Sequence, residues 1–112
     1  MATKENLTCK AGVPFPIAIQ CCDTTGPLDL TGGSVRLRIS DFDRQQLVLD
    51  IQTGVDAAAV LTNPGQGDAL FTVTLEPGVY RYDIEAVLAE GAASDQAFGT
   101  IDAADSLFAD FT

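Results

Sequence analysis

The chain repeatedly alternates apolar and polar residues with a period of two. The clearest run covers residues 79 to 86. One face of this run would hold Tyr80, Tyr82, Ile84 and Ala86, and the opposite face would hold Val79, Arg81, Asp83 and Glu85. This pattern is typical of a strand with one buried face, because successive side chains of a strand point to opposite sides. No amphipathic helix accompanies these runs, so the sequence predicts an all-β fold.

The other alternating runs are short, and turn residues separate them. They cover residues 15–22, 34–40, 47–52, 69–75 and 96–103. Residues 58–62 could form a further short strand or one helical turn, since the alanines at 57–59 favour helix. About seven or eight short strands at this spacing predict a single immunoglobulin-like antiparallel β-sandwich. We expect it to occupy residues 1–104 of the 112, with 105–112 as a tail.

The same alternation predicts which side chains face the core and which face solvent. Arg36 and Arg38 should point outward, and Leu28 and Leu30, set among turn residues, should plug the end of the core. Pro16 lacks a backbone N–H, which places the first run at an edge or at an irregular start. The predicted core between the sheets consists of Val35, Leu37, Ile39, Phe71, Val73, Tyr82 and Ile84.

Tyr80 follows the turn Pro77-Gly78 directly. One interpretation is a tyrosine corner, with the ring in the core and the hydroxyl on a nearby backbone group. The other is an ordinary core aromatic residue. The sequence leaves both open.

The charge balance argues against several kinds of partner. Sixteen acidic and six basic side chains give a net charge of -10. Such a surface repels phosphate backbones and anionic lipids, so we expect no nucleic-acid and no membrane partner. The first residues show no apolar segment followed by small residues, so we expect no signal peptide and synthesis in the cytoplasm.

The residues that usually carry chemistry are few. The chain has no histidine, which removes Ser–His and Cys–His nucleophiles and the usual small zinc site. Asp41, Asp43 and Asp50 surround one predicted hairpin, but they lack the glycine and distal glutamate of a recognised calcium loop. We therefore expect no enzyme, no cofactor and no metal, and we interpret the carboxylates as solubilising groups.

The three cysteines do not form a metal-binding pair. Cys21 and Cys22 are adjacent, so one should face the core and the other should not. Together with Cys9 they are interpreted as small apolar fillers. A disulfide from Cys9 to Cys21 or Cys22 is the alternative, and a reducing cytoplasm argues against it.

Five segments hold the most specific patterns of the chain: AGVPFPIAIQCCD, TTGPLDLTGGSVRLRISDFD, TNPGQGDALFTVTL, PGVYRYDIEAVL and AFGTID. In this order they resemble the immunoglobulin-like domain of tailed-bacteriophage virion proteins, in particular the N-terminal domain of baseplate upper proteins and their small stand-alone relatives. The similarity covers roughly residues 7–103, and the order of DLTG, NPxxG and PGxYxY is its most specific part.

The resemblance implies a non-enzymatic structural protein of the virion, present in many copies in a symmetric assembly with other virion proteins. An accessory or adaptor role in the tail, baseplate or fibre attachment is one reading, and a capsid decoration (cement) protein on the head is the alternative. A carbohydrate-binding β-sandwich is an alternative of another class. It would need exposed aromatic side chains, whereas the chain has no tryptophan and both tyrosines are predicted to point inward.

The tail holds three large apolar side chains, Leu107, Phe108 and Phe111. Leaving such a side chain in water costs roughly 1.5 to 3 kcal/mol. We predict that these residues dock on a neighbouring subunit. Packing against their own domain is the alternative.

Overall fold

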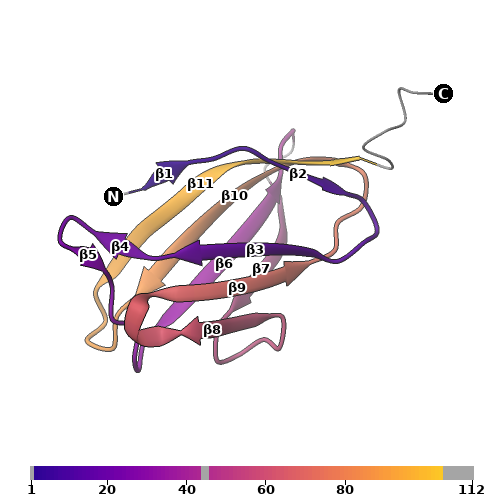
Figure 1. The fold of residues 1–112 in the computed structure, drawn as a ribbon. Coiled ribbons are helices and arrows are strands. Elements are labelled where there is room, and N and C mark those ends of the chain that lie inside the picture. Colours follow the sequence, from indigo (N-terminus) through magenta and orange to yellow (C-terminus); the bar gives the residue numbers. More distant parts are fainter. Residues whose placement is uncertain (1, 44–45, 105–112) are drawn as a thin grey trace.

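A computed structural model of the protein describes residues 2–43 and 46–104, and within them the regular structure is almost entirely β (Figure 1). One 3-10 turn, η1 (Pro64–Gln66), and no α-helix occur in these residues, which confirms the all-β prediction. In the same residues no helix has the length and apolar character needed to span a membrane. The strands are β1 (Thr3–Lys4), β2 (Leu7–Lys10), β3 (Phe15–Gln20), β4 (Cys22–Asp23), β5 (Gly26–Pro27), β6 (Ser34–Asp41), β7 (Leu47–Gln52), β8 (Ala59–Asn63), β9 (Asp68–Val73), β10 (Gly78–Val87) and β11 (Ala93–Ala104).

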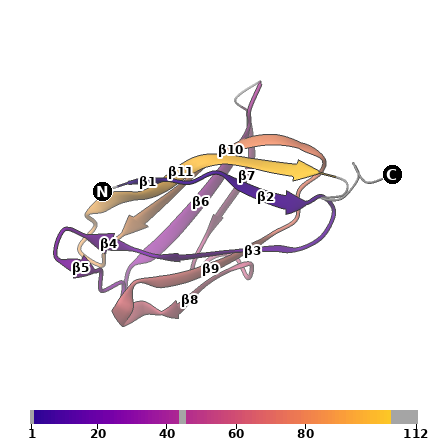
Figure 2. The ribbon, with the colours of Figure 1, turned by 45° about the horizontal axis from the view of Figure 1, so that its top comes forward.

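Two main sheets face each other as layers (Figure 2). The larger sheet has the order β1-β11-β10-β6-β7, with β2 also paired to β11, and the smaller has the order β3-β9-β8. A short β4-β5 ribbon connects β3 to the segment that precedes β6. Pro16 lies on β3, at an edge of the smaller sheet, as predicted.

The N-terminal segment departs from the prediction of a purely antiparallel fold. Both β1 and β2 pair with β11 in parallel, with Thr3 opposite Ala97 and Leu7 opposite Ile101. The sequence analysis predicted no strand before residue 15, because residues 3–10 show only weak alternation. Their strand conformation depends on a partner that lies some 90 residues further along the chain.

A single core cluster joins the two sheets. All seven predicted core residues are buried, and Val35, Leu37, Ile39 and Phe71 have no exposed surface. Leu28 and Leu30 also belong to this cluster, which explains why a turn-rich segment holds two leucines. Burial of each such side chain contributes roughly 1.5 to 3 kcal/mol to folding.

Two local features are settled by the strand register. β8 is a strand from Ala59 onward, and only the alanines at 57 and 58 lie in a turn. Leu47 alternates with Leu49 and Ile51 in the sequence but does not share their face, because the β6–β7 pairing shifts register between Ile39 and Ser40. Leu47 is therefore 59% exposed, whereas Ile51 is buried.

The turn at residues 63–67 requires a glycine at its last position. Gly67 ends η1 with φ 76°, a left-handed conformation that favours glycine. A Cβ at this position would also overlap the carbonyl oxygen of Cys21. The NPxxG pattern is thus explained by backbone packing between two loops.

Candidate functional site

The basic residues of the described chain gather on one surface. Lys10, Arg36, Arg38 and Arg81 occupy strand positions that alternate with buried residues of the larger sheet, so their side chains point outward. Lys4 pairs with Phe98, whose side chain is exposed on the same side of the sheet. The sixth basic residue, Arg44, lies outside the described residues. We call this surface the outer face of the six-stranded sheet.

Carboxylates balance the basic residues on this face. The strand register places five of them there: Asp50, Asp83, Glu85, Asp95 and Asp102. Five positive and five negative side chains make the outer face electrically neutral, although the whole chain carries a charge of -10. The other nine described carboxylates lie off this face.

Two ion pairs hold the arginines of β6 in place. Arg36 forms a two-pronged pair with Asp50 of β7, and the Arg36 guanidinium lowers the pKa of the Asp50 carboxyl group. Arg38 donates from Nε to Oδ1 of Asp83 on β10 at 2.9 Å. Exposed pairs of this kind contribute little to stability, about 0 to 1 kcal/mol each, so their main effect here is to fix side-chain orientation.

The outer face also holds exposed apolar side chains. Phe42, Val79 and Phe98 are 37%, 46% and 43% exposed. The backbone N–H of Phe42 donates to the carbonyl of Val79 at 3.1 Å, and the guanidinium carbon of Arg81 lies 4.5 Å from the centroid of the Phe42 ring. We define the outer-face patch as Arg81 and the five exposed apolar residues of this sheet and its β6–β7 hairpin: Phe42, Leu47, Val48, Val79 and Phe98.

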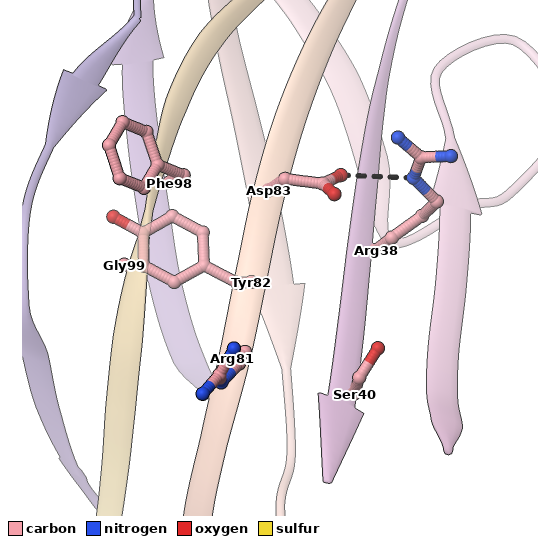
Figure 3. Close-up of a pocket in the computed structure, with 7 residues that line it drawn as sticks. All are labelled: Arg38, Ser40, Arg81, Tyr82, Asp83, Phe98 and Gly99. Atoms are coloured by element: carbon pink, nitrogen blue, oxygen red, sulfur yellow. Dashed lines mark hydrogen bonds and ion pairs between the residues drawn. The ribbon is translucent and has the colours of Figure 1, made fainter. Parts of the chain in front are cut away.

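A hollow of about 350 Å³ opens in this face between β6, β10 and β11. Figure 3 shows Asp83 of β10 turned toward Arg38 of β6, with Phe98 on the other side of β10. The hollow is lined by Arg38, Ser40, Arg81, Tyr82, Asp83, Phe98 and Gly99. A phenyl ring beside arginines and a hydroxyl group is typical of protein contact surfaces, where aromatic and arginine side chains are enriched.

The floor of the hollow is fixed by the N-terminal segment. The hydroxyl of Tyr82 donates to the carbonyl of Glu5 at 2.8 Å, and the N–H of Glu5 donates to the carbonyl of Phe98 at 2.9 Å. Burial, and to a smaller extent the Glu5 carboxylate, raise the pKa of Tyr82. A Cβ at Gly99 would overlap the Glu5 carbonyl, so glycine lets the first segment approach β11.

Tyr80 makes the hydrogen bond that the corner interpretation predicted. Its ring is buried, and its hydroxyl donates to the carbonyl of Glu76 at 2.7 Å. The acceptor lies four residues upstream, before the turn Pro77-Gly78. Tyr80 thus belongs to the core and also makes the backbone hydrogen bond that distinguishes a tyrosine corner from an ordinary core aromatic residue.

The cysteines behave as the strand pattern predicted. Cys21 is fully buried, Cys22 is partly exposed, Cys9 is buried, and all three are free thiols. Burial raises the pKa of Cys21 to about 11, with smaller contributions from Cys22 and Asp68. The low ionisation of this thiol fits a filler of the core rather than a nucleophile.

Two of the three carboxylates of the predicted hairpin, those of Asp41 and Asp50, have partners in the protein. Asp50 binds Arg36, and Oδ1 of Asp41 accepts a hydrogen bond from the N–H of Asp43 at 2.9 Å. Within residues 2–43 and 46–104, no three His, Cys, Asp or Glu side chains form a group that could hold a metal ion.

The predicted docking residues Leu107, Phe108 and Phe111 lie outside the described residues, so their docking stays a prediction. The sequence analysis did not single out Phe42 or Phe98. For Phe98 a signal was available, since it shares a period of two with Thr100 and Asp102 rather than with the buried Ile101.

No protein-family model matches the chain, and no curated protein matches it significantly.

Proposed function

We propose that the chain is an immunoglobulin-like module that serves as a non-enzymatic structural protein of a tailed-bacteriophage virion. The order β11-β10-β6-β7 corresponds to strands G, F, C and C′ of that fold, and β3-β9-β8 corresponds to strands B, E and D. In this assignment β1 and β2 form a first strand attached to strand G. The role we assign is a multi-copy accessory or adaptor of the tail, baseplate or fibre attachment.

The observation that carries the proposal is the Tyr80 hydrogen bond. Immunoglobulin-like domains place a tyrosine near the start of strand F and bind its hydroxyl to backbone a few residues upstream. Tyr80 is the third residue of β10 and binds the Glu76 carbonyl. It also lies within PGVYRY, one of the patterns in which the chain resembles the phage domains.

The chain departs from antibody-type domains in the centre of its core. Those domains use a disulfide between strands B and F and a tryptophan on strand C. Here Tyr82 stands two residues after the corner tyrosine, where the second cysteine would be, and the chain has no tryptophan. The hydrogen bond from Tyr82 to Glu5 joins strand F to the N-terminal segment instead.

The test of the virion role is the protein content of intact particles. Particles from the source would be purified by density gradient, and their proteins quantified by mass spectrometry against the major tail and capsid proteins. We expect several copies of the chain per particle and immunogold label on the tail or baseplate. Label on the head would instead support capsid decoration, and absence of the chain from intact particles would contradict the proposal.

Within this role we propose that Leu107, Phe108 and Phe111 bind a neighbouring virion subunit. Deletion of residues 105–112 should leave the melting temperature unchanged and abolish incorporation into particles. A truncated chain that unfolds or aggregates would show that the segment packs on its own domain. One that folds normally and still joins particles would show that the segment is dispensable.

A further inference from the structure

The outer face of the six-stranded sheet combines three features of a contact surface. It is electrically neutral in a strongly acidic chain, because its five basic and five acidic residues balance. The face and its β6–β7 hairpin together carry five of the eight large apolar side chains that are exposed in the described residues. Arg81 lies on the ring of Phe42 and has no ion pair among the described residues. Together these features mark the face as unusual for a solvent-facing surface.

We propose that this face binds the same face of a second copy of the chain. Two copies of charge -10 repel each other, and contact is least unfavourable where the approaching surfaces are neutral. Besides Asp41, eight described carboxylates lie off this face: Glu5, Asp23, Asp29, Asp43, Asp56, Asp68, Glu76 and Glu90. A symmetric dimer through the neutral face keeps these carboxylates apart.

The size of the face fits a stable dimer. The 42 residues of its six strands, at about 3.3 Å per residue and about 4.8 Å between strands, cover about 670 Å². This is close to the area that each partner contributes to a standard interface, about 800 Å². The smaller sheet, with three strands of five or six residues, offers only about 300 Å².

In one arrangement of the two copies Arg81 and Glu85 of β10 become complementary, although Asp83 then faces the Asp83 of the second copy. Arg81, Asp83 and Glu85 follow each other on the outer side of this strand, and Asp83 is already paired with Arg38. A twofold axis that crosses β10 at Asp83 runs the two β10 strands antiparallel. It places Arg81 of each copy opposite Glu85 of the other. Because Phe98 lies opposite Asp83 in the sheet, the same axis brings the two Phe98 rings together.

The first experiment measures the oligomeric state by sedimentation velocity on the full chain, from about 1 to 300 µM. We expect a monomer–dimer equilibrium. Val79→Asp puts a carboxylate into the outer-face patch and should weaken the dimer at least about tenfold. Val60→Asp is the matched control, because Val60 of β8 is 49% exposed against 46% for Val79 but lies on the other sheet. It should leave the dimer unchanged.

The second experiment tests the pairing by charge reversal. Arg81→Glu and Glu85→Arg should each weaken the dimer at least about tenfold, since each places like charges opposite one another. The double variant restores opposite charges and should return the dissociation constant to within about threefold of the original. Melting temperatures of all variants show that they remain folded, and restoration in the double variant cannot come from misfolding.

Three results would overturn the proposal. The unmodified chain could sediment as a monomer at every concentration. Val60→Asp could dissociate the dimer while Val79→Asp leaves it intact, which would assign the contact to the smaller sheet. The double charge reversal could fail to restore the dimer, which would exclude the antiparallel pairing of β10. Each result is independent of whether the chain is found in virions, so the dimer and the virion role succeed or fail separately.

Discussion

The two sheets share one core but present very different surfaces to the outside. The outer face of the six-stranded sheet carries both signs of charge and two exposed phenylalanine rings, Phe42 and Phe98. The outer side of the three-stranded sheet carries mainly small or uncharged residues, such as Ala18 and Thr72, and one carboxylate, Asp68. Burial in the core therefore constrains the inward-facing residues of a strand, whereas the outward-facing residues can differ between the two sheets.

The contrast is sharpest within β6, where neighbouring residues face opposite ways. Leu37 is fully buried between the sheets, and Arg38 beside it is exposed and paired with Asp83. Leu37→Ala should lower the free energy of unfolding by about 2 to 5 kcal/mol, because it removes buried contacts and leaves a cavity. Arg38→Ala should cost at most about 1 kcal/mol. Chemical denaturation of both variants checks this, and equal losses would show that the division between inner and outer faces is wrong.

The attachment of the N-terminal segment gives the next largest effect. Gly99→Ala adds a methyl group against the backbone carbonyl of Glu5, and overpacking of this kind costs about 1 to 3 kcal/mol. Amide exchange of residues 3–10 should accelerate in this variant. Gly65→Ala is the control, since its Cβ would meet nothing within 4 Å and its φ is not positive. Equal stability of the two variants would mean that residues 3–10 do not pack on β11 as described.

The cysteines probe the interior at two places, Cys9 on β2 of the larger sheet and Cys21 and Cys22 where β3 leads into β4. Cys22 is partly exposed and should react with a thiol reagent in the folded protein, whereas Cys9 and Cys21 should react only after unfolding. Burial raises the pKa of Cys21 from 9.0 to about 11, so the folded protein keeps this proton where the unfolded chain loses it. The stabilisation of the folded protein by the protonated Cys21 thiol is therefore complete below pH 9 and is lost as the pH rises toward 11.

Each proton released on unfolding changes the free energy of unfolding by at most about 1.4 kcal/mol per pH unit. Cys21→Ala should therefore show a shallower fall of stability between pH 9 and pH 11. The burial of Tyr80 and Tyr82, whose pKa values are also raised, adds to the fall in both proteins. Identical slopes for the two proteins would contradict the assigned burial of Cys21.

Local patterns were sufficient to predict much of the fold. Alternation in β6 and β10 identified the buried residues, because burial in this fold follows the period of the strand. Pro16 identified an edge strand, and the Pro77-Gly78 turn pointed to the Tyr80 hydrogen bond. In each case the physical cause lies within a few residues of the signal.

Features that depend on distant residues could not be predicted. The hydrogen bond of Tyr82 joins residues 77 positions apart, and the exposure of Leu47 follows from a register shift that alternation cannot reveal. The outer-face patch depends on which strands become neighbours: Phe42 meets Arg81 only because β6 lies beside β10. The predicted docking residues 107–111 lie outside the described residues and stay a prediction.

The most direct measurement of the division between the two surfaces is hydroxyl-radical footprinting of side chains at low and high protein concentration. Oxidation of Phe42, Val79 and Phe98 should fall as the concentration rises, because a second copy covers these exposed side chains. Oxidation of Val60, on the smaller sheet and equally exposed, should stay constant. Protection of Val60 with continued oxidation of Phe98, or no protection of either at any concentration, would contradict the assignment of association to the outer face of the six-stranded sheet.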